Sequence, residues 1–204
     1  MEPLLAGAAT LGVNLTAADA ARLLRLLDEL ERWNRSYNLT AIEDREEMIT
    51  HHLLDSLSIS PDLAGTRIAD VGTGAGFPGL PLAVANPARQ FTLIDSSGKK
   101  VRFVAHAARA LALGNVTALK VRAETLRPQV PFDTVTARAL APLPELIELL
   151  TPLCGPATRV LAMKARWPGE ELGKLPAPWR LAGSRTLEVP GLDAERCVLT
   201  LSMG

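Results

Sequence analysis

The glycine-rich segment at residues 72–79 constrains the fold of this chain more than any other feature. It reads Gly72-Thr-Gly-Ala-Gly-Phe-Pro-Gly79 and follows the apolar run 67–71. Glycines let the backbone turn sharply and approach a ligand closely. Pro78 suits a first helical turn, where its missing N–H costs nothing. The segment therefore predicts a strand, a ligand-binding loop and a helix in direct succession, the opening unit of a nucleotide-binding α/β fold.

Short apolar runs alternate with helical stretches around and after this loop. We expect strands at Arg67–Val71, Gln90–Asp95, Val116–Val121, Asp133–Arg138 and Thr158–Lys164. We expect helices at Pro78–Asn86, Gly98–Leu113, Pro142–Leu153 and Pro168–Leu175. Because a helix follows almost every strand, the strands should form a parallel sheet covered on both faces.

The chain ends differently, in the two strand-like runs Trp179–Val189 and Arg196–Met203. The segment Pro190–Asp193 that joins them is too short for a crossover helix, so the runs should pair antiparallel. A mostly parallel seven-stranded sheet with a terminal antiparallel hairpin is typical of the Rossmann-like class I methyltransferase fold. The dinucleotide-binding form of the fold lacks this hairpin.

The first 60 residues read as helices. Thr16 and Asp19 indicate a helix start, and an apolar stripe at helical spacing follows, made of Leu23, Leu24, Leu26, Leu27, Leu30 and Trp33. We expect a polar connector over residues 34–40 and a second helix starting near Asp44. This predicts an N-terminal helical extension, residues 1–60, followed by the α/β domain of residues 61–204.

Composition narrows the class of protein. Two cysteines exclude a disulfide framework and a CxxC metal site, and we expect no metal. The N-terminus lacks the basic start of a signal peptide, and no apolar run approaches the roughly 20 residues of a membrane helix. We therefore expect a cytoplasmic protein without a membrane partner, and nothing in the sequence demands more than a monomer.

Two carboxylates bear on which cofactor the loop binds. Asp70 lies just before the glycines, where it could face the positively charged methionine part of S-adenosylmethionine and would repel a pyrophosphate. Asp95 ends the next strand, where it could accept hydrogen bonds from the ribose of either cofactor. Asp70 and the terminal hairpin favour S-adenosylmethionine, and an NAD-dependent oxidoreductase is the alternative.

Residues after the third and fourth strands bear on the acceptor. Ala123 and Glu124 lie where an adenine ring commonly packs, although Glu124 could equally be a solvated surface acid. Arg138 ends the fourth strand beside the expected methyl group and could bind a phosphate or a base edge; a salt bridge is its alternative. An Asn/Asp-Pro-Pro-aromatic motif and a Pro-Cys nucleophile are absent, which disfavours amine and pyrimidine C5 methylation.

Several motifs occur together with the glycine loop. They are Trp33-Asn34, Tyr37-Asn-Leu-Thr40, His52-Leu-Leu-Asp55-Ser56, Asp95-Ser96, Gly98-Lys-Lys-Val-Arg102-Phe103, Arg138-Ala139 and Met163-Lys164. From about Trp33 to Arg196 the chain resembles the glucose-inhibited division protein B family, the RsmG-type guanine-N7 methyltransferases of 16S ribosomal RNA. The resemblance implies S-adenosylmethionine-dependent methylation of N7 of one guanine, position 527 in the 530 loop, in 16S ribosomal RNA or the small ribosomal subunit.

The resemblance and the loop together name the expected site residues. Cofactor contacts are expected at Asp70, Gly72, Gly74, Gly76, Phe77, Asp95, Ala123, Glu124 and Arg138. Arg138, Asn38 and His52 are the expected catalytic residues. Guanine N7 carries a lone pair and no proton, so its methylation needs no general base, in agreement with the absence of an obvious one.

Basic residues indicate where RNA would bind. The expected RNA contacts are Lys99, Lys100, Arg102, Lys164 and Arg196. The first three open a helix at the cofactor end of the sheet, where they could bind phosphates or form a solvated basic face. Residues 1–60 carry a net charge of −5 and residues 61–204 of +5. Other acceptors stay open at this point: a small molecule, a protein, or none, if the chain is a non-catalytic ribosome assembly factor.

Overall fold

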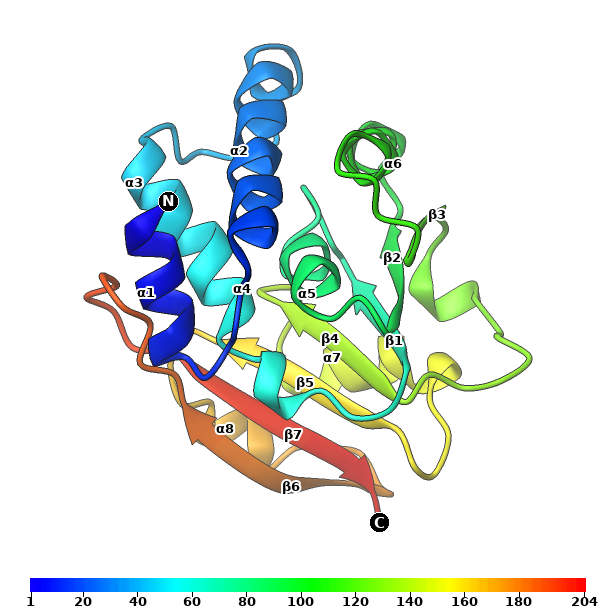
Figure 1. Ribbon diagram of the computed structural model, residues 1–204. Coiled ribbons are helices and arrows are strands. Elements are labelled where there is room, and N and C mark those ends of the chain that lie inside the picture. Colours follow the sequence, from blue (N-terminus) through cyan, green and yellow to red (C-terminus); the bar gives the residue numbers. More distant parts are fainter.

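A seven-stranded sheet organises the computed structural model, which describes all 204 residues (Figure 1). The strands are β1 (Arg67–Val71), β2 (Gln90–Asp95), β3 (Val116–Lys120), β4 (Thr134–Arg138), β5 (Arg159–Lys164), β6 (Trp179–Thr186) and β7 (Cys197–Met203). Their order is β3-β2-β1-β4-β5-β7-β6. Strands β1 to β5 pair in parallel, and β7 runs antiparallel to β5 and β6. The expected mostly parallel sheet with a terminal antiparallel hairpin is confirmed.

Helices cover both faces of this sheet (Figure 1). They are α1 (Glu2–Thr10), α2 (Ala17–Tyr37), α3 (Arg45–Met48), α4 (Asp55–Leu57), α5 (Gly79–Ala85), α6 (Gly98–Ala110), α7 (Leu143–Leu150) and α8 (Gly169–Leu172). A π-helix, η1 (Ile49–Leu54), joins α3 to α4, and three 3-10 turns complete the set: η2 (Ser60–Asp62), η3 (Ala123–Thr125) and η4 (Thr151–Leu153). None of these helices is both long and apolar enough to cross a bilayer.

Strand β5 shows how the two faces are built. Leu161 and Met163 join the core that contains α1, α2, α5 and α6, whereas Val160 and Ala162 join the core that contains α7. Successive side chains of a strand point to opposite faces, so a strand buried on both faces reads as a continuous apolar run. The N-terminal helices share the first core with the sheet, and the expected boundary between residues 60 and 61 stays a prediction.

The first long helix begins as expected and ends later. Thr16 and Asp19 form a reciprocal capping box, with both backbone N–H groups bonded at 3.1 Å to the other side chain. The polar connector expected over residues 34–40 is wrong for its first half, because α2 continues to Tyr37. The helix ends at Asn38, which adopts a left-handed φ of 48°, and the Asn34 side chain accepts bonds from the next two backbone N–H groups.

The second expected helix also starts where predicted. Asp44 Oδ1 accepts the N–H groups of Glu46 and Glu47, both at 2.9 Å. The π-helical turn η1 that follows was not expected. The strands expected at Arg67–Val71 and Gln90–Asp95 are found with those bounds, and the other expected elements are shortened at their ends, most of all Pro168–Leu175, of which only Gly169–Leu172 is helical. Helix α8 stops before the prolines at 176 and 178, because a residue that precedes proline disfavours the helical conformation.

Candidate active site

Two cavities meet at the carboxyl ends of the parallel strands. The glycine-loop cavity has a volume of about 370 Å³ and is lined by Val71, Gly72, Ile94, Asp95, Ser96, Lys100, Val121, Arg122, Ala123, Glu124, Arg138, Ala139, Leu140 and Leu149. The histidine cavity has a volume of about 320 Å³ and is lined by Ile42, His51, His52, Asp55, Arg138, Ala139, Met163, Lys164, Ala165 and Arg196. Only Arg138 and Ala139 line both. These two residues therefore form a wall that the cavities have in common.

Asp95 supplies the carboxylate of the glycine-loop cavity. Its Oδ2 accepts the N–H of Gly74 at 3.1 Å, and its Oδ1 accepts the N–H of Ser97 at 2.8 Å. These bonds fix the carboxylate at the cavity wall, where it is 8% exposed. Each carboxylate oxygen accepts more than one hydrogen bond, so Asp95 keeps capacity for hydroxyl groups of a ligand.

Asp70 occupies a different place from the one expected. Its side chain is 1% exposed and does not line the cavity. Oδ2 accepts bonds from the Thr73 hydroxyl at 2.5 Å and the Gly79 N–H at 2.9 Å, and Oδ1 accepts the Thr136 hydroxyl at 3.1 Å. Burial raises the pKa of the carboxyl, although these bonds oppose the rise. The charge contact expected between Asp70 and a ligand is therefore wrong for this structure. The buried carboxylate instead holds the glycine loop in place through Thr73 and Gly79.

One glycine of the loop lines the cavity, and the others contribute to the hydrogen bonds and packing beneath it. Gly72 lines the cavity with a φ of +68°, and a Cβ there would lie 2.6 Å from Leu140. Gly74 bonds Asp95 through its N–H. Gly76 is buried, with a φ of +87°, and makes no direct contribution to the lining. Ala123 and Glu124 line the cavity as expected, with Ala123 buried and Glu124 exposed.

The histidine cavity is organised around a partly buried ion pair. Arg138 Nη1 lies 2.8 Å from Asp55 Oδ2 and also donates to the His51 carbonyl at 3.1 Å. Arg196 Nε lies 3.3 Å from the other Asp55 oxygen. The Arg138 guanidinium is 5.8 Å from the centre of the Phe77 ring. The salt bridge considered for Arg138 is therefore present, and it holds the guanidinium at the junction of the two cavities.

His52 stacks on the glycine loop. Its ring lies 4.7 Å from the Phe77 ring at 16°, and its Nε2 is 2.9 Å from the Thr40 hydroxyl. Phe77 thus lies beneath the histidine and does not line the glycine-loop cavity. Burial, reinforced by the charge of Arg138, lowers the pKa of His52 to about 4. The ring is therefore neutral at pH 7, where it can exchange hydrogen bonds but carries no charge.

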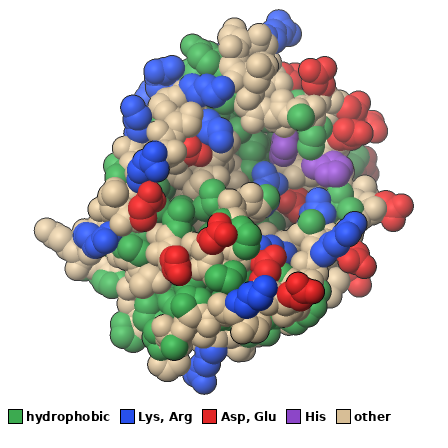
Figure 2. Space-filling model, turned by 180° about the vertical axis from the view of Figure 1, so that it is seen from behind, with side chains coloured by type: hydrophobic (Ala, Val, Ile, Leu, Met, Phe, Trp, Pro, Cys, Tyr) green, Lys and Arg blue, Asp and Glu red, His purple; other side chains and the backbone are tan.

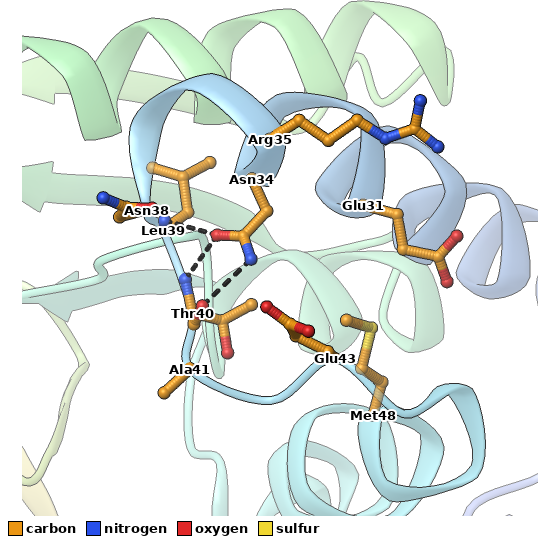
Figure 3. Close-up of a pocket in the computed structure, with 9 residues that line it drawn as sticks. All are labelled: Glu31, Asn34, Arg35, Asn38, Leu39, Thr40, Ala41, Glu43 and Met48. Atoms are coloured by element: carbon orange, nitrogen blue, oxygen red, sulfur yellow. Dashed lines mark hydrogen bonds between the residues drawn. The ribbon is translucent and has the colours of Figure 1, made fainter.

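Asn38 is not brought together with Arg138 and His52. It lies on a broad groove of about 840 Å³ formed by α2, α3 and the loop that joins them, lined by Glu31, Asn34, Arg35, Asn38, Leu39, Thr40, Ala41, Glu43 and Met48. Figure 3 shows the Asn38 side chain pointing away from Glu43 and Met48, while Asn34 makes the hydrogen bonds that hold the loop. The catalytic role expected for Asn38 therefore has no support from this geometry.

The expected RNA-binding residues fall into two groups. Lys99 is exposed but donates to the Tyr37 carbonyl at 3.0 Å, Lys100 lies 3.9 Å from Asp95, and Arg102 is exposed without an ion pair. Figure 2 shows Lys and Arg side chains gathered over the end of the molecule that carries α6. Asp and Glu gather over the opposite end, around α3, and a hollow flanked by histidines lies between them.

The Lys164 ammonium makes two hydrogen bonds that the sequence did not indicate. Its ammonium donates to Glu171 Oε2 at 2.9 Å and to the Ala141 carbonyl at 3.0 Å. Glu171 Oε2 also accepts the Leu143 N–H at the start of α7. Partial burial opposes ionisation of Glu171, but these two donors outweigh it and hold the pKa below its ordinary value. The positive charge of Lys164 is therefore neutralised in this structure.

Asp55 is the site residue that sequence reasoning missed. It appears in the His-x-x-Asp-Ser motif, yet no role followed from the motif alone. The available signal was spacing, because His51 and Asp55 are four residues apart and so share one face of a helix. That face turns out to line the histidine cavity.

Known proteins resemble the chain over most of its length. One Xanthomonas campestris protein named ribosomal RNA small subunit methyltransferase G is 49% identical over 183 residues, 90% of this chain and 86% of the relative. A protein of the same name from Saccharophagus degradans is 45% identical over 196 residues, 96% of this chain and 88% of the relative.

Solved structures agree on the fold. TrmN from Thermus thermophilus is 25% identical with a TM-score of 0.56, over 73% of this chain and 47% of that one. A SAM-dependent methyltransferase from Aquifex aeolicus is 19% identical with a TM-score of 0.57, over 82% and 97% of the two chains.

The family profile "rRNA small subunit methyltransferase G" matches residues 19–199, nearly the whole chain. This match decides against the NAD-dependent oxidoreductase and the non-catalytic assembly factor that the sequence had left open, because the family is one of methyltransferases. The chain therefore belongs to the rRNA small subunit methyltransferase G family.

Proposed function

We propose that the protein transfers the methyl group of S-adenosylmethionine to N7 of a guanine in 16S ribosomal RNA, at position 527 of the 530 loop. The observation that carries this proposal is the meeting of two cavities at Arg138 and Ala139. The glycine-loop cavity takes the cofactor and the histidine cavity takes the base. Transfer occurs where the two join.

The residues of the glycine-loop cavity suit this cofactor. The Asp95 carboxylate has free acceptor capacity for two ribose hydroxyls, and the cavity volume of about 370 Å³ lies within the range of small-molecule sites, roughly 300–1,000 Å³. Ile94, Val121 and Leu149 supply apolar walls for an adenine ring. When bound, the cofactor supplies a methyl group on a positively charged sulfur.

The histidine cavity suits an acceptor that has no proton to lose. His52 is neutral and already bonded to Thr40, and Asp55 is held between two guanidinium groups. His52 is a weak base because its pKa is lowered to about 4, and its Nδ1, which has no hydrogen-bond partner, is buried. The Asp55 carboxylate is already paired, so neither group is placed to remove a proton. The N7 lone pair forms the new bond to carbon while the electron pair of the broken carbon–sulfur bond stays on sulfur. The chain's contribution is to align the base and exclude water.

Charge supports RNA as the acceptor over a small molecule or a protein. The basic side chains over the α6 end of the molecule border a hollow (Figure 2), and Lys100, Arg122 and Arg138 line the glycine-loop cavity itself. These positive charges attract the phosphate backbone of RNA, whereas they add no binding free energy for an uncharged metabolite. We expect the protein to act as a monomer in the cytoplasm, where small subunits assemble.

The test is methyl transfer to small ribosomal subunits from cells that lack the modification. Incubation with labelled S-adenosylmethionine should place one methyl group per subunit, and strand cleavage specific for N7-methylguanine should map it to the 530 loop. Naked 16S RNA in a parallel reaction identifies which form is the substrate. Label on a ribosomal protein, or on a metabolite extract but not on RNA, would contradict the proposal and favour the other acceptors.

A further inference from the structure

Asp55 has no assigned role in the reaction, yet it lies at the centre of the histidine cavity. We propose that Asp55 is a positioning residue, which holds Arg138 at the junction of the cavities and Arg196 at the outer wall, and which offsets their charge during transfer. This inference rests on the proposed function, because it concerns the same site and the same acceptor base.

The contacts of Asp55 differ between its two oxygens. Oδ2 lies 2.8 Å from Arg138 Nη1, a charge-assisted hydrogen bond of short length. Oδ1 lies 3.3 Å from Arg196 Nε but makes no hydrogen bond, although it is buried. Arg138 is therefore fixed in direction by Asp55, whereas Arg196 pairs with Asp55 by charge and makes its hydrogen bond to the Glu195 carbonyl, at 2.9 Å.

Local backbone geometry brings these groups together. The π-helix Ile49–Leu54 ends immediately before Asp55 and presents His51, His52 and Asp55 to one cavity. The His51 carbonyl takes a second bond from the same Arg138 nitrogen that bonds Asp55. Two groups of this segment, the His51 carbonyl and the Asp55 carboxylate, thus bind the Arg138 guanidinium. Irregular π-turns within helices often occur at functional sites.

Charge gives Asp55 a second effect. As the methyl group moves, positive charge passes from sulfur to the guanine ring. Arg138 and Arg196 both line the cavity that holds this ring, and two unpaired guanidinium groups would oppose the incoming charge. The Asp55 carboxylate, 2% exposed, cancels one of the two positive charges at close range. Its effect should be larger in the transition state than in the bound ground state, so it should change kcat more than KM.

A purely structural ion pair is the competing interpretation. Burying such a pair contributes little net stability, because desolvation offsets the attraction. All three charged groups here also line the same cavity, where they remain within reach of a ligand. The positions of the groups therefore favour a role in the reaction over one in folding.

The test compares Asp55→Asn with wild type in methyl transfer to unmodified subunits. Asparagine keeps the shape and one acceptor oxygen but removes the charge. We expect kcat to fall by about 30-fold or more, since misplacing a group by 1 Å can cost about 100-fold. KM for subunits should change by less than about threefold, and S-adenosylhomocysteine affinity likewise. The double variant Asp55→Asn/Arg196→Gln should be less impaired than the product of the two single effects.

Ser56→Ala is the matched control for loss of folding. Ser56 is the next residue, fully buried, and bonds the His52 carbonyl without lining the cavity. It should lower Tm while leaving kcat within about twofold. Asp55→Asn with wild-type kcat would overturn the inference, as would a loss of kcat matched by Ser56→Ala at equal Tm. Absence of N7 methylation by the wild-type protein would instead overturn the proposed function.

Discussion

The imidazole ring of His52 lies flat against the Phe77 ring, with centroids 4.7 Å apart and planes inclined by 16°. His52 belongs to the N-terminal extension and Phe77 to the glycine loop, so the stack joins the two parts of the chain at the site. Such ring pairs are worth about 0.5–1.5 kcal/mol beyond the area they bury. The extension therefore supplies one wall of the histidine cavity and also supports the loop that shapes the glycine-loop cavity.

Protonation of His52 should weaken the fold. Its pKa is lowered to about 4 from 6.5, so the stability it contributes is complete above pH 6.5 and is lost as the pH falls toward 4. Urea unfolding at pH 7 and pH 4.5 measures the loss, and this group should account for about 2–3 kcal/mol of it at most. His52→Phe keeps the stack without titrating. An unchanged pH difference in that variant would show that other groups cause the loss.

Two substitutions of Asp70 separate bracing from direct charge contact. Asp70→Ala removes the acceptor of three bonds and should weaken S-adenosylhomocysteine binding at least tenfold, about 1.4 kcal/mol. Asp70→Asn can keep Oδ for Gly79 and Thr73 while its amide donates to the Thr136 hydroxyl. Calorimetry should therefore find the asparagine variant within about threefold of wild type. If both variants lose affinity equally, the negative charge itself acts on the ligand.

The order of helices and strands can be predicted from the sequence, but the direction in which the Asp70 side chain points was not. Strand β1 alternates, and Asp70 shares the face of Ile68, which packs in the core with α5. Period-two reasoning applied through the last residues of the strand would have placed the carboxylate beneath the helix. Its position just before the glycines suggests a ligand contact instead, but closeness to the loop in sequence does not mean that the side chain faces the cavity.

Other parts of the site could not be predicted from one sequence. The π-helix at Ile49–Leu54 has no distinct periodic signal, because its apolar residues also fit an ordinary α-helix. The bond between Lys164 and Glu171 joins the end of β5 to α8, and its existence depends on how far that short helix folds back. Asn38 was placed by the family motif, and its outward orientation follows from its left-handed backbone.

Arg102 should contribute to RNA binding through phosphate contact. It is exposed on the first turns of α6 and makes no ion pair. Arg102→Gln should reduce the slope of log affinity against log salt by about 0.7–0.9, the value for one lost phosphate contact. Arg109→Gln, in the last turn of the same helix, is the matched control and should leave the slope unchanged. Equal slopes for wild type and Arg102→Gln would place the RNA elsewhere.

Glu171 should compete with RNA for Lys164. Its carboxylate accepts the Lys164 ammonium at 2.9 Å and the Leu143 N–H at 2.6 Å, the pair of donors that a phosphate oxygen could also use. Glu171→Gln removes the competing charge and should raise RNA affinity by about twofold to fivefold at low salt, the range for a partly exposed ion pair. Filter binding to a 530-loop RNA measures the gain.

Glu170→Gln controls for net charge in that experiment. It changes the overall charge by the same amount at the neighbouring exposed position, without a bond to Lys164. The gain should appear only in Glu171→Gln and should vanish in Lys164→Ala/Glu171→Gln, because no ammonium is left to release. A similar gain in Glu170→Gln would mean that general charge, rather than the release of Lys164, controls the affinity.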